Sequence, residues 1–452
     1  IDVIIGPRSA LFTPFPRLGM IVIDEEHESS YKSEASPKYH ARETAMEIAR
    51  LQGASVVLGS ATPSLEAYYR ADKGEYRLFT LKERLTGGSL PTVYTVDLRQ
   101  ELKEGNRSIF SRKLQELLAD RLQKKEQSIL FLNRRGYAGF ISCRSCGQVM
   151  KCPHCDVSLS EHKGGKLLCH YCGYHEPKPK VCPKCGSRYI SGFRAGTQQI
   201  EEKLKEMFPE VRTLRMDADT TRTKESYEQI LSAFANQEAD ILIGTQMIVK
   251  GHDFPNVTLV GVLAADLSLY VSDYHAAERT FQLLTQAAGR AGRGSEPGEV
   301  VIQTYRPDHY SVQTAKEQDY EAFYEQEMEY RRMLLYPPVW NMLVILCASK
   351  QEQTAYDSAK LLVQEIDTWQ ENIKAAMERV GEDFKKKRVF PVGPADPAVA
   401  KVNDIYKKVI YIKTKDYQTL VELKDRLEHY MRDNRAFKDT VVQFDFNPMS
   451  GF

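Results

Sequence analysis

Eight of the nine cysteines in this 452-residue chain fall within one short segment, as four Cys-x-x-Cys pairs. The pairs are Cys143/Cys146, Cys152/Cys155, Cys169/Cys172 and Cys182/Cys185. Each pair places two thiolates at one tight turn, and two such pairs complete a tetrahedral four-cysteine zinc site. The segment is therefore predicted to bind two zinc ions.

Disulfide bonds are the alternative use of these cysteines, and they are typical of oxidising compartments. The chain shows no signal-peptide pattern and no apolar run long enough to span a membrane, and 27% of its residues are charged. We therefore expect a soluble protein of a reducing compartment and favour zinc. A glycine after the second cysteine in three pairs (Gly147, Gly173, Gly186) permits the positive φ of a zinc knuckle.

Spacing leaves two ways of pairing the motifs open. Sequential pairing would close the first site around a loop of only five residues. Nested pairing would place a site made by the two inner pairs inside a site made by the two outer pairs. We favour nesting, because it brings the ends of the segment together, as an inserted module requires. The ninth cysteine, Cys347, lies in an apolar run and is expected to be buried in a core.

The apolar run Met20–Ile23 is followed by four polar residues, Asp24, Glu25, Glu26 and His27. Such a run predicts a buried parallel strand that delivers acids to the carboxyl edge of a sheet. There one carboxylate can hold Mg²⁺ and the next can activate a water for attack on a γ-phosphate. A strand followed by a solvated acidic loop is the alternative for this pattern alone.

Two further apolar runs end in small or polar residues. The run Ser55–Leu58 leads to Gly59, Ser60, Ala61 and Thr62, whose hydroxyls either relay the state of a nucleotide or cap the next helix. The run Asp240–Gly244 leads to a loop with Lys250, Gly251 and Asp253, which can contact a phosphate backbone and the nucleotide. Ordinary strand-to-helix turns are the alternative for each run alone.

The fourth segment is rich in glycine and alanine and contains Gln286, Gly289, Arg290 and Arg293. Arginines three residues apart lie on one face of a helix, so we expect both guanidinium groups to point the same way. Two guanidinium groups at such a place can clamp a triphosphate as arginine fingers. A solvated basic helix would not account for the small residues around them.

In this order the four segments resemble motifs II, III, V and VI of superfamily 2 helicases. The strand Ser128–Leu132 and the loop residues Asn133, Arg134 and Arg135 resemble motif IV. An eight-cysteine insertion directly after this motif is similar to the PriA family of replication-restart helicases. The segments Gly6–Phe12 and Tyr336–Pro338 add to the resemblance, which covers essentially the whole chain.

The resemblance implies an ATP-dependent DNA helicase of primosome assembly that uses ATP and Mg²⁺ and binds two zinc ions in nested pairs. It also implies binding of single-stranded and forked DNA, of primosome proteins and of single-strand-binding proteins by a cytoplasmic bacterial monomer. The implied catalytic residues are Asp24, Glu25, Glu26, His27, Gln286, Arg290 and Arg293. The implied cofactor-binding residues are Gly59, Ser60, Ala61, Thr62, Gly251, Asp253 and Gly289. The implied DNA-binding residues are Arg8, Ser9, Tyr31, Lys32, Tyr39, Arg42, Asn133, Arg134, Arg135 and Lys250.

One departure from the family concerns the P-loop, Gly-x-x-x-x-Gly-Lys-Thr/Ser, which does not occur in these 452 residues and would precede Ile1. Without its lysine and backbone cradle the β- and γ-phosphates lose their main anchor, so we predict that this chain alone does not hydrolyse ATP. Two other functions stay open: a zinc- and DNA-binding scaffold without motor activity, and another superfamily 2 helicase that acts on RNA. The net charge of +1 means that nucleic-acid contacts must come from local patches.

The predicted fold class is α/β with two RecA-like helicase lobes, because apolar strands alternate with helical stretches. We expect an incomplete first lobe at residues 1–108. The second lobe is expected at 109–140 and 192–308, with the zinc-binding insertion at 141–191. A helical connector at 309–340 is expected to lead to a C-terminal α+β domain at 341–452. The β-α-β-β-α-β order of that last part predicts a ferredoxin-like domain.

Overall fold

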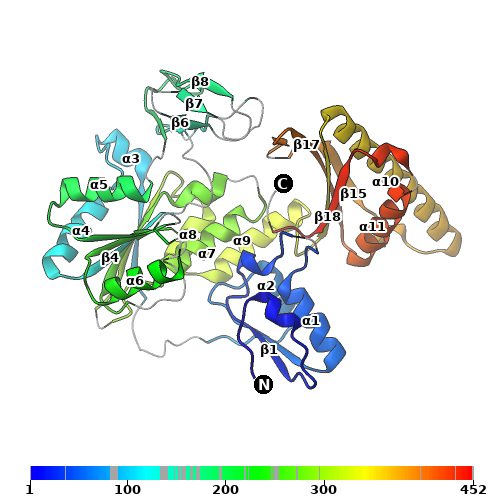
Figure 1. Ribbon diagram of the computed structural model, residues 1–452, viewed down its shortest axis with the longest axis horizontal. Coiled ribbons are helices and arrows are strands. Elements are labelled where there is room, and N and C mark those ends of the chain that lie inside the picture. Colours follow the sequence, from blue (N-terminus) through cyan, green and yellow to red (C-terminus); the bar gives the residue numbers. More distant parts are fainter. Residues whose placement is uncertain are drawn as a thin grey trace.

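The computed structural model describes residues 2–35, 37–81, 90–132, 141–146, 148–150, 153, 159–162, 166–168, 174–192, 196–217, 220–221, 223–245, 248, 254–270, 273–294, 296–397, 399–432 and 434–449. These residues form a large α/β body, a small cysteine-rich module above it and a C-terminal α+β domain at its side (Figure 1). No helix among the described residues has the length and apolar character that a membrane span needs.

The centre of the α/β body is a six-stranded parallel sheet. Its strand order is β10 (Thr213–Met216), β11 (Ile241–Gly244), β4 (Gln127–Leu132), β12 (Val257–Leu263), β13 (Glu299–Thr304) and β3 (Thr92–Asp97). Every residue of β4, β11 and β12 is buried, as expected for parallel strands covered on both faces. The predicted α/β class is confirmed in this part of the chain.

Helices cover both faces of this sheet. The helices α4 (Arg112–Lys124) and α5 (Thr197–Met207) supply leucines and an isoleucine to the core of one face. The other face is covered by α6 (Lys224–Ala235), α7 (Ala276–Ala288), α8 (Tyr310–Glu317) and α9 (Tyr320–Met333). The two apolar cores together make this the most extensively buried part of the molecule, and they fix the position of α7.

Strand β3 lies in the sheet of the second lobe, although the predicted domain organisation assigns it to the first lobe. Residues 1–108 were expected in the first lobe, but β3 pairs in parallel with β13, from Thr92 opposite Glu299 to Asp97 opposite Thr304. The sheet of the second lobe therefore begins at Thr92. A short, half-buried edge strand carries no pattern that tells one parallel sheet from another, which is why the sequence did not reveal its partner.

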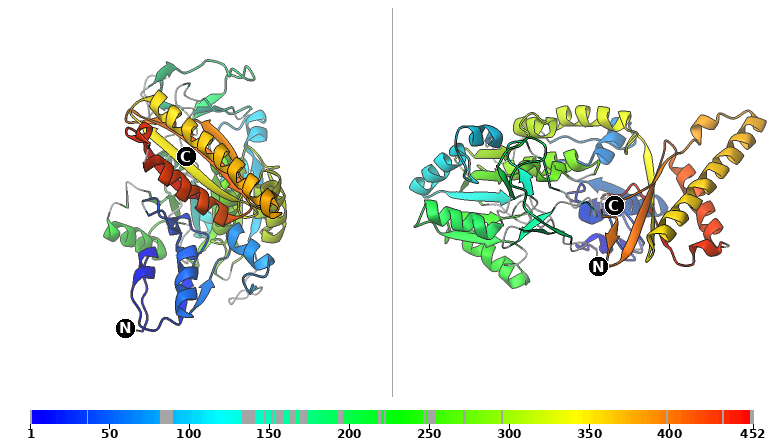
Figure 2. Two further views of the ribbon diagram at one scale, coloured as in Figure 1. Left: turned by 90° about the vertical axis from the view of Figure 1, so that its right-hand side faces the viewer. Right: turned by 90° about the horizontal axis from the view of Figure 1, so that it is seen from above.

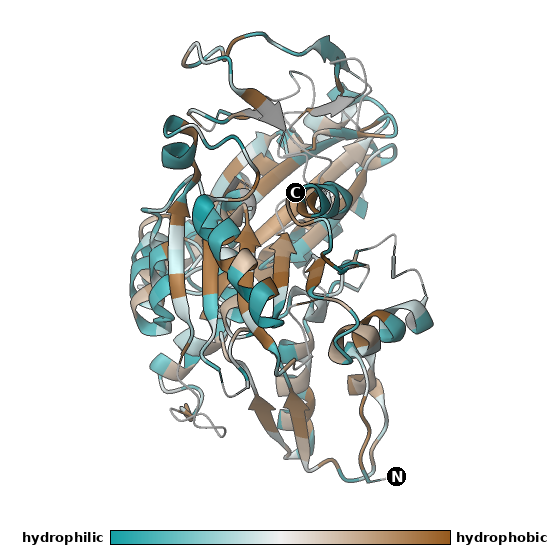
Figure 3. Cartoon of the chain, turned by 90° about the vertical axis from the view of Figure 1, so that its left-hand side faces the viewer, coloured by the Kyte–Doolittle hydropathy of each residue, from teal (hydrophilic) through white to brown (hydrophobic). Residues whose placement is uncertain are grey.

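The segment before Thr92 forms a separate small unit around two parallel strands, β1 (Met20–Ile23) and β2 (Ser55–Leu58). Helix α1 (Ala41–Gln52) connects them, and α2 (Leu65–Asp72) follows β2. Both strands carry exposed apolar side chains. Their hydrophobic residues colour the two arrows near the N-terminus brown in Figure 3. This unit contains the acidic and hydroxyl-rich segments of the predicted motor.

Helix α2 joins this unit to the second lobe. Leu65, its first residue, is fully buried in the same core as α7 and α9. The Tyr68 ring meets the rings of Tyr320 and Tyr324 with centroids 4.9 and 4.7 Å apart, and the Tyr320 hydroxyl donates to the Pro63 carbonyl at 2.9 Å. An apolar and aromatic contact therefore presses the loop after β2 against α7.

The C-terminal domain follows the predicted β-α-β-β-α-β order. It contains β14 (Asn341–Ser349), α10 (Glu352–Val380), β15 (Phe390–Ala395), β17 (Ile405–Thr414), α11 (Tyr417–Arg432) and β18 (Val441–Phe446), with the short β16 (Lys401–Val402) paired to β17. The antiparallel strand order is β15-β17-β14-β18. Both helices lie on the outer face of the sheet (Figure 2).

The inner face of this sheet turns towards the motor. Residues of β14 alternate, so that Leu343, Ile345 and Cys347 pack under the helices while Met342 and Val344 face inward. The inward residues pack with Tyr274 and Tyr336. Cys347 is fully buried, which confirms its predicted core position.

Candidate functional site

The cysteine module begins and ends as two adjacent strands. The strand β5 (Ile141–Cys143) pairs antiparallel with β9 (Ile190–Gly192), and between them lie the short strands β6 (Ser160–His162), β7 (Lys166–Leu168) and β8 (His175–Pro177). The ends of the insertion thus return together, as the nested pairing predicts. Val399 of the C-terminal domain packs against the small apolar core of this module.

The two outer cysteine pairs converge on one point. The four Sγ atoms of Cys143, Cys146, Cys182 and Cys185 all lie within 4.8 Å of one another. Two of these separations are 3.5 Å (Cys143 to Cys185) and 3.7 Å (Cys146 to Cys182). A tetrahedron with zinc–sulfur bonds of about 2.3 Å has sulfur–sulfur edges of about 3.8 Å, so the four residues fit zinc.

The backbone around Cys182 has the form of a zinc knuckle. The Lys184 N–H donates to the Cys182 Sγ at 3.4 Å, and Gly186 has a φ of +70°. Desolvation raises the pKa of Cys182, but backbone N–H groups of Cys185 and Lys184 stabilise the thiolate and bring the pKa to about 7. The two inner pairs, with Cys152, Cys155, Cys169 and Cys172, lie outside the described residues.

The four polar residues after β1 divide into an outward and an inward pair. Asp24 and Glu25 are exposed, whereas Glu26 and His27 are buried. Glu25 has a φ of +47°, a left-handed conformation that costs on the order of 1–3 kcal/mol in a residue other than glycine. Its N–H donates to Asp24 Oδ1 at 2.9 Å, and Gly59 packs beside the Asp24 carboxylate. Two oriented carboxylates therefore face outward at the edge of the strands.

Glu26, predicted to be catalytic, instead lies at the centre of a buried hydrogen-bond network. It accepts from the Ser64 N–H at 2.6 Å, from the Ser64 hydroxyl at 2.9 Å and from Arg42 Nη1 at 3.0 Å. Arg42, predicted to contact DNA, is only 5% exposed. Burial disfavours its charge, but Glu26 and Glu43 hold the pKa of Arg42 above its ordinary value. We therefore assign both residues to the packing of α1 against α2.

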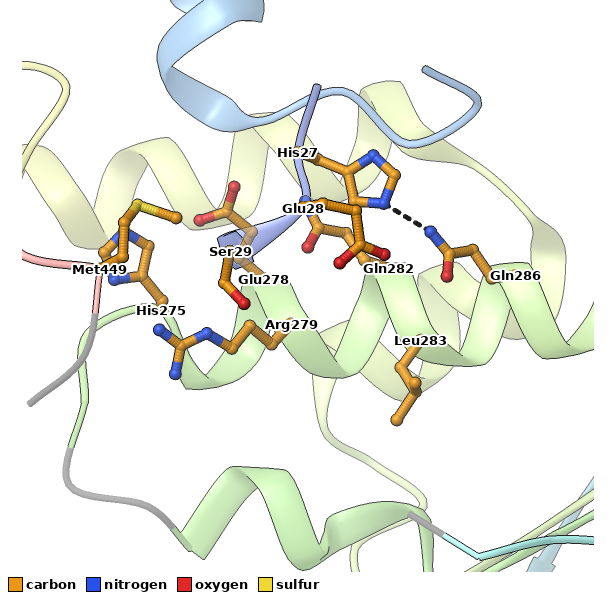
Figure 4. Close-up of a pocket in the computed structure, with 10 residues that line it drawn as sticks. All are labelled: His27, Glu28, Ser29, His275, Glu278, Arg279, Gln282, Leu283, Gln286 and Met449. Atoms are coloured by element: carbon orange, nitrogen blue, oxygen red, sulfur yellow. Dashed lines mark hydrogen bonds between the residues drawn. The ribbon is translucent and has the colours of Figure 1, made fainter. Parts of the chain in front are cut away.

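His27 contacts the second lobe through one nitrogen of its ring and its own lobe through the other. Gln286 Nε2 lies 2.5 Å from His27 Nε2 (Figure 4). On the other side of the ring, His27 Nδ1 lies 2.6 Å from the Ser60 hydroxyl. Since an amide nitrogen can only donate, His27 Nε2 accepts and Nδ1 carries the proton that it donates to Ser60. Glu25 Oε2 lies 3.6 Å from the same Nδ1. One imidazole thus joins Glu25, Ser60 and Gln286.

Helix α7 presents a stripe of three polar side chains to the first lobe. Glu278 accepts from the Leu65 N–H at 2.9 Å, Gln282 donates to the Thr62 carbonyl at 3.4 Å, and Gln286 contacts His27. The spacing of four residues places all three on one face of the helix. Thr62 is therefore held directly by the second lobe and Ser60 only through His27, whereas Ala61 is exposed between them.

The arginines after α7 lie on a loop instead of a helix. The helix ends at Ala288 with Gly289 as its C-cap, so the prediction that Arg290 and Arg293 share a helical face was wrong. Gly292 has a φ of +68°, and a side chain there would collide with the backbone of Gly298. These glycines stop the helix and fold the loop tightly. Arg290 is half-buried, and Arg293 is exposed with its Nε donating to the Gly289 carbonyl at 2.8 Å.

The predicted DNA-binding residues near the N-terminus are mostly engaged within the protein. Arg8 Nη1 donates to the carbonyls of Ser30 and Lys32 at 2.6 and 2.7 Å. The Tyr31 hydroxyl donates to the Asp24 carbonyl at 2.7 Å. Tyr39 is half-buried with its ring against Phe12 at 5.2 Å, and Ser9 is exposed. The remaining predicted contacts lie outside the described residues: Asn133, Arg134, Arg135 and Lys250, as do the predicted cofactor contacts Gly251 and Asp253.

The clearest departure from the predicted DNA contacts is at Lys32. It is 5% exposed, and its ammonium group contacts Asp445 Oδ1 at 2.9 Å and donates to the Phe446 carbonyl at 3.0 Å. Lys38 reaches the other oxygen of Asp445 at 3.3 Å. The carboxylate on β18 therefore binds the loop after β1 to the C-terminal domain, and Lys32 is a structural residue here.

Sequence reasoning missed four residues of this region: Glu278, Gln282, Arg331 and Asp445. Arg331 is fully buried and contacts Glu278 Oε2 at 3.0 Å and Glu327 Oε1 at 2.6 Å. The polar residues of α7 have a readable signal, since Glu278, Gln282 and Gln286 recur every four positions along one face of the helix. Asp445 has none, because its lysine partners are more than 400 positions away.

The comparisons with protein families define the class of the chain. The PriA DNA helicase Cys-rich region (CRR) domain matches residues 152–177, which include all four inner cysteines. The Helicase conserved C-terminal domain matches residues 188–295, which include α7 and the arginine loop. Together with the parallel sheet and the cysteine site, these matches define a helicase second lobe with a zinc-ribbon insertion.

Full-length relatives identify the family. "Replication restart protein PriA" of Bacillus subtilis (strain 168) is 48% identical over 450 residues, which cover 99% of this chain and 54% of the relative. The protein of the same name from Synechocystis sp. is 44% identical over 459 residues, covering 99% and 53%. The chain belongs to the PriA family and spans about half the length of the curated relatives it matches.

Solved structures give a weaker likeness. "S. cerevisiae Dbp5 bound to RNA and ADP BeF3" is 15% identical with a TM-score of 0.34, covering 70% of this chain and 63% of the other.

The ion pairs of Asp445 predict a stability effect. We expect Asp445→Asn to lower the free energy of unfolding by about 3 kcal/mol in urea titrations, because two mostly buried ammonium groups lose their counter-charge. Asp425→Asn is the matched control, since Asp425 is 67% exposed, and its effect should stay within about 0.5 kcal/mol. Equal effects of the two substitutions would contradict the structural role of Asp445.

The outer cysteine site predicts a loss of metal. Cys182→Ser should reduce the zinc content measured by atomic emission by one ion per chain, because the site loses one of four thiolate ligands. Cys347→Ala is the control, as it removes a buried thiol far from the module. A zinc content that falls equally in both variants would contradict the assignment.

Proposed function

We propose that the protein to which this chain belongs is an ATP-dependent DNA helicase that acts in replication restart. The observation that carries the proposal is the agreement of two independent features. The relatives that align over 99% of the chain are named replication restart proteins. The chain itself holds a motor lobe matched by the helicase C-terminal domain, joined to an acidic loop through His27.

The residues around Asp24 fit a nucleotide with its Mg²⁺. Hard cations prefer carboxylate oxygens, and Asp24 and Glu25 are exposed, adjacent and oriented by the backbone. Asp24 would hold the Mg²⁺, and Glu25 would take the proton from the attacking water. Arg290 and Arg293 would neutralise phosphate charge from the second lobe. Bound ATP would supply the phosphoryl group whose cleavage drives the cycle.

His27 is suited to pass information between the lobes. Its ring lies near Glu25 in the first lobe and contacts Gln286 in the second. A shift of α7 would change the hydrogen bond to Gln286 and with it the orientation of the imidazole next to Glu25. We therefore assign His27, Ser60 and Gln286 to the coupling of ATP hydrolysis with DNA binding. Single-stranded DNA would bind across both lobes.

We further propose a second zinc ion in the inner cysteine pairs, as the match over residues 152–177 supports. The module would separate or read forked DNA and dock other primosome and single-strand-binding proteins. A monomer in the bacterial cytoplasm is consistent with the relatives' replication role. The Asn133–Arg135 loop and Lys250 are the proposed phosphate contacts of the second lobe.

The exposed apolar face of β1 and β2 supports a role for additional chain in the complete motor. Met20 is 58% exposed and Val22 is 64% exposed, although parallel strands are normally covered on both faces. A P-loop-containing segment would complete this sheet and supply the phosphate cradle. Without it, the 452 residues would act as a zinc- and DNA-binding scaffold, which is the second candidate function for the chain alone.

The test is a substitution in the protein extended by its upstream P-loop segment. Glu25→Gln should keep DNA binding but lower ATP hydrolysis and unwinding of forked DNA by about 10²–10⁴-fold, because the base for the attacking water is lost. Glu34→Gln, an exposed residue of the same loop, is the control and should match wild type. The 452-residue chain alone should show no DNA-stimulated ATPase. Unwinding that survives Glu25→Gln would refute the proposed role.

A further inference from the structure

A second cluster of ligand-type side chains lies where α2 meets α7, away from the cysteine module. Ligand atoms of Glu66, His275 and Glu278 all lie within 4.8 Å of one another. Glu66 is in the first turn of α2, and the other two residues stand at and just inside the start of α7. The cluster therefore takes ligands from both lobes.

His275 is oriented as a metal-ligating histidine. It is 1% exposed, and its Nδ1 lies 3.2 Å from Asp273 Oδ1, while Arg279 holds the other oxygen of Asp273 at 2.7 Å. A carboxylate at this nitrogen favours the tautomer with the proton on Nδ1, which leaves a lone pair on Nε2. Nε2 is buried, has no hydrogen-bond partner among the described residues, and lies 3.8 Å from Glu66 Oε1.

The charges around the cluster favour a cation. Two sets of ion pairs meet at the cluster: Glu66 and Asp273 with His275 and Arg279, and Glu278 and Glu327 with Arg331. Burial disfavours the imidazolium, but Asp273 and Glu66 raise the pKa of His275. With a neutral His275, four carboxylates against two guanidinium groups leave two negative charges in excess in a largely buried place, which is costly. A divalent cation would neutralise both excess negative charges, whereas a proton on His275 would neutralise only one of them.

We propose that Glu66, His275 and Glu278 form a binding site for a divalent cation of the zinc type, separate from the cysteine sites. One imidazole and two carboxylates suit zinc, which accepts three protein ligands and one further ligand. His275 and Glu278 also line a pocket of about 120 Å³, at the opposite end from His27 and Gln286 (Figure 4). The pocket therefore reaches two of the three ligand residues and would give an ion its path to the cluster.

The bound ion would link the two lobes directly. Arg331 at Glu278 Oε2 and the Leu65 N–H at Oε1 already fix the Glu278 carboxylate, as hydrogen-bond partners of metal-binding side chains do. The ion would add a bond between the start of α2 and α7, next to the polar stripe that positions His27. Occupancy of this site would therefore set how firmly the lobes are held together.

The test compares zinc content and thermal stability of three variants of the full 452-residue chain, each loaded with Zn²⁺ and freed of excess metal. His275→Arg places a positive charge between Asp273 and Glu66 and offers no ligand lone pair. It should hold one zinc fewer per chain than wild type and lose the rise in Tm that added Zn²⁺ gives wild type. Glu66→Gln should behave in the same way, and it stands in if the first variant does not fold.

His429→Arg is the matched control, because His429 is an exposed residue of α11. It should retain the wild-type zinc content and the wild-type response to Zn²⁺. The opposite result is equally clear. If His275→Arg and Glu66→Gln both retain the wild-type zinc content, His275 is only a charged partner of the two carboxylates, and the proposed site does not exist.

Discussion

The contact of helix α7 with the first lobe is the interaction on which the rest of the site depends. Glu278, Gln282 and Gln286 each satisfy a polar group of the first lobe at successive turns of one helix. Leaving a buried polar group without its partner costs about 1–3 kcal/mol, so the three contacts fix one register of the lobes. The aromatic packing of α2 on α9 stabilises the contact between the lobes, whereas the polar stripe of α7 determines how the lobes are positioned.

This constraint explains why the four consecutive residues 24–27 point in different directions. β1 ends where the chain must turn, and the left-handed φ of Glu25 sends Asp24 and Glu25 outward while Glu26 and His27 point inward. The Glu26 carboxylate accepts hydrogen bonds from Arg42 and from the start of α2. His27 is left to contact α7. In the proposed cycle, chemistry and communication thus come from neighbouring residues with opposite orientations, and the contact of His27 with Glu25 joins the two.

Much of the fold followed from local patterns in the sequence. The buried parallel strands and the βαββαβ order of the C-terminal domain have signals within a short stretch of chain. The convergence of the outer cysteine pairs followed instead from the requirement that the ends of an inserted module return together. The partner of β3, the end of α7 and the roles of Lys32 and Arg42 did not, because each is decided by contacts between distant segments. A lysine in a polar loop has the same sequence pattern whether it meets phosphate or Asp445. Only the packed structure distinguishes the two.

The most direct test of this account is the DNA-stimulated ATPase of the protein extended by its upstream P-loop segment, with Gln286→Ala compared with wild type. The account predicts that DNA stimulation falls on the order of tenfold, as a coupling free energy of about 1–3 kcal/mol implies, while DNA affinity stays unchanged. Gln313→Ala, an exposed glutamine of α8, controls for loss of a surface amide. Undiminished DNA stimulation in Gln286→Ala would contradict the claim that His27 couples the lobes through α7.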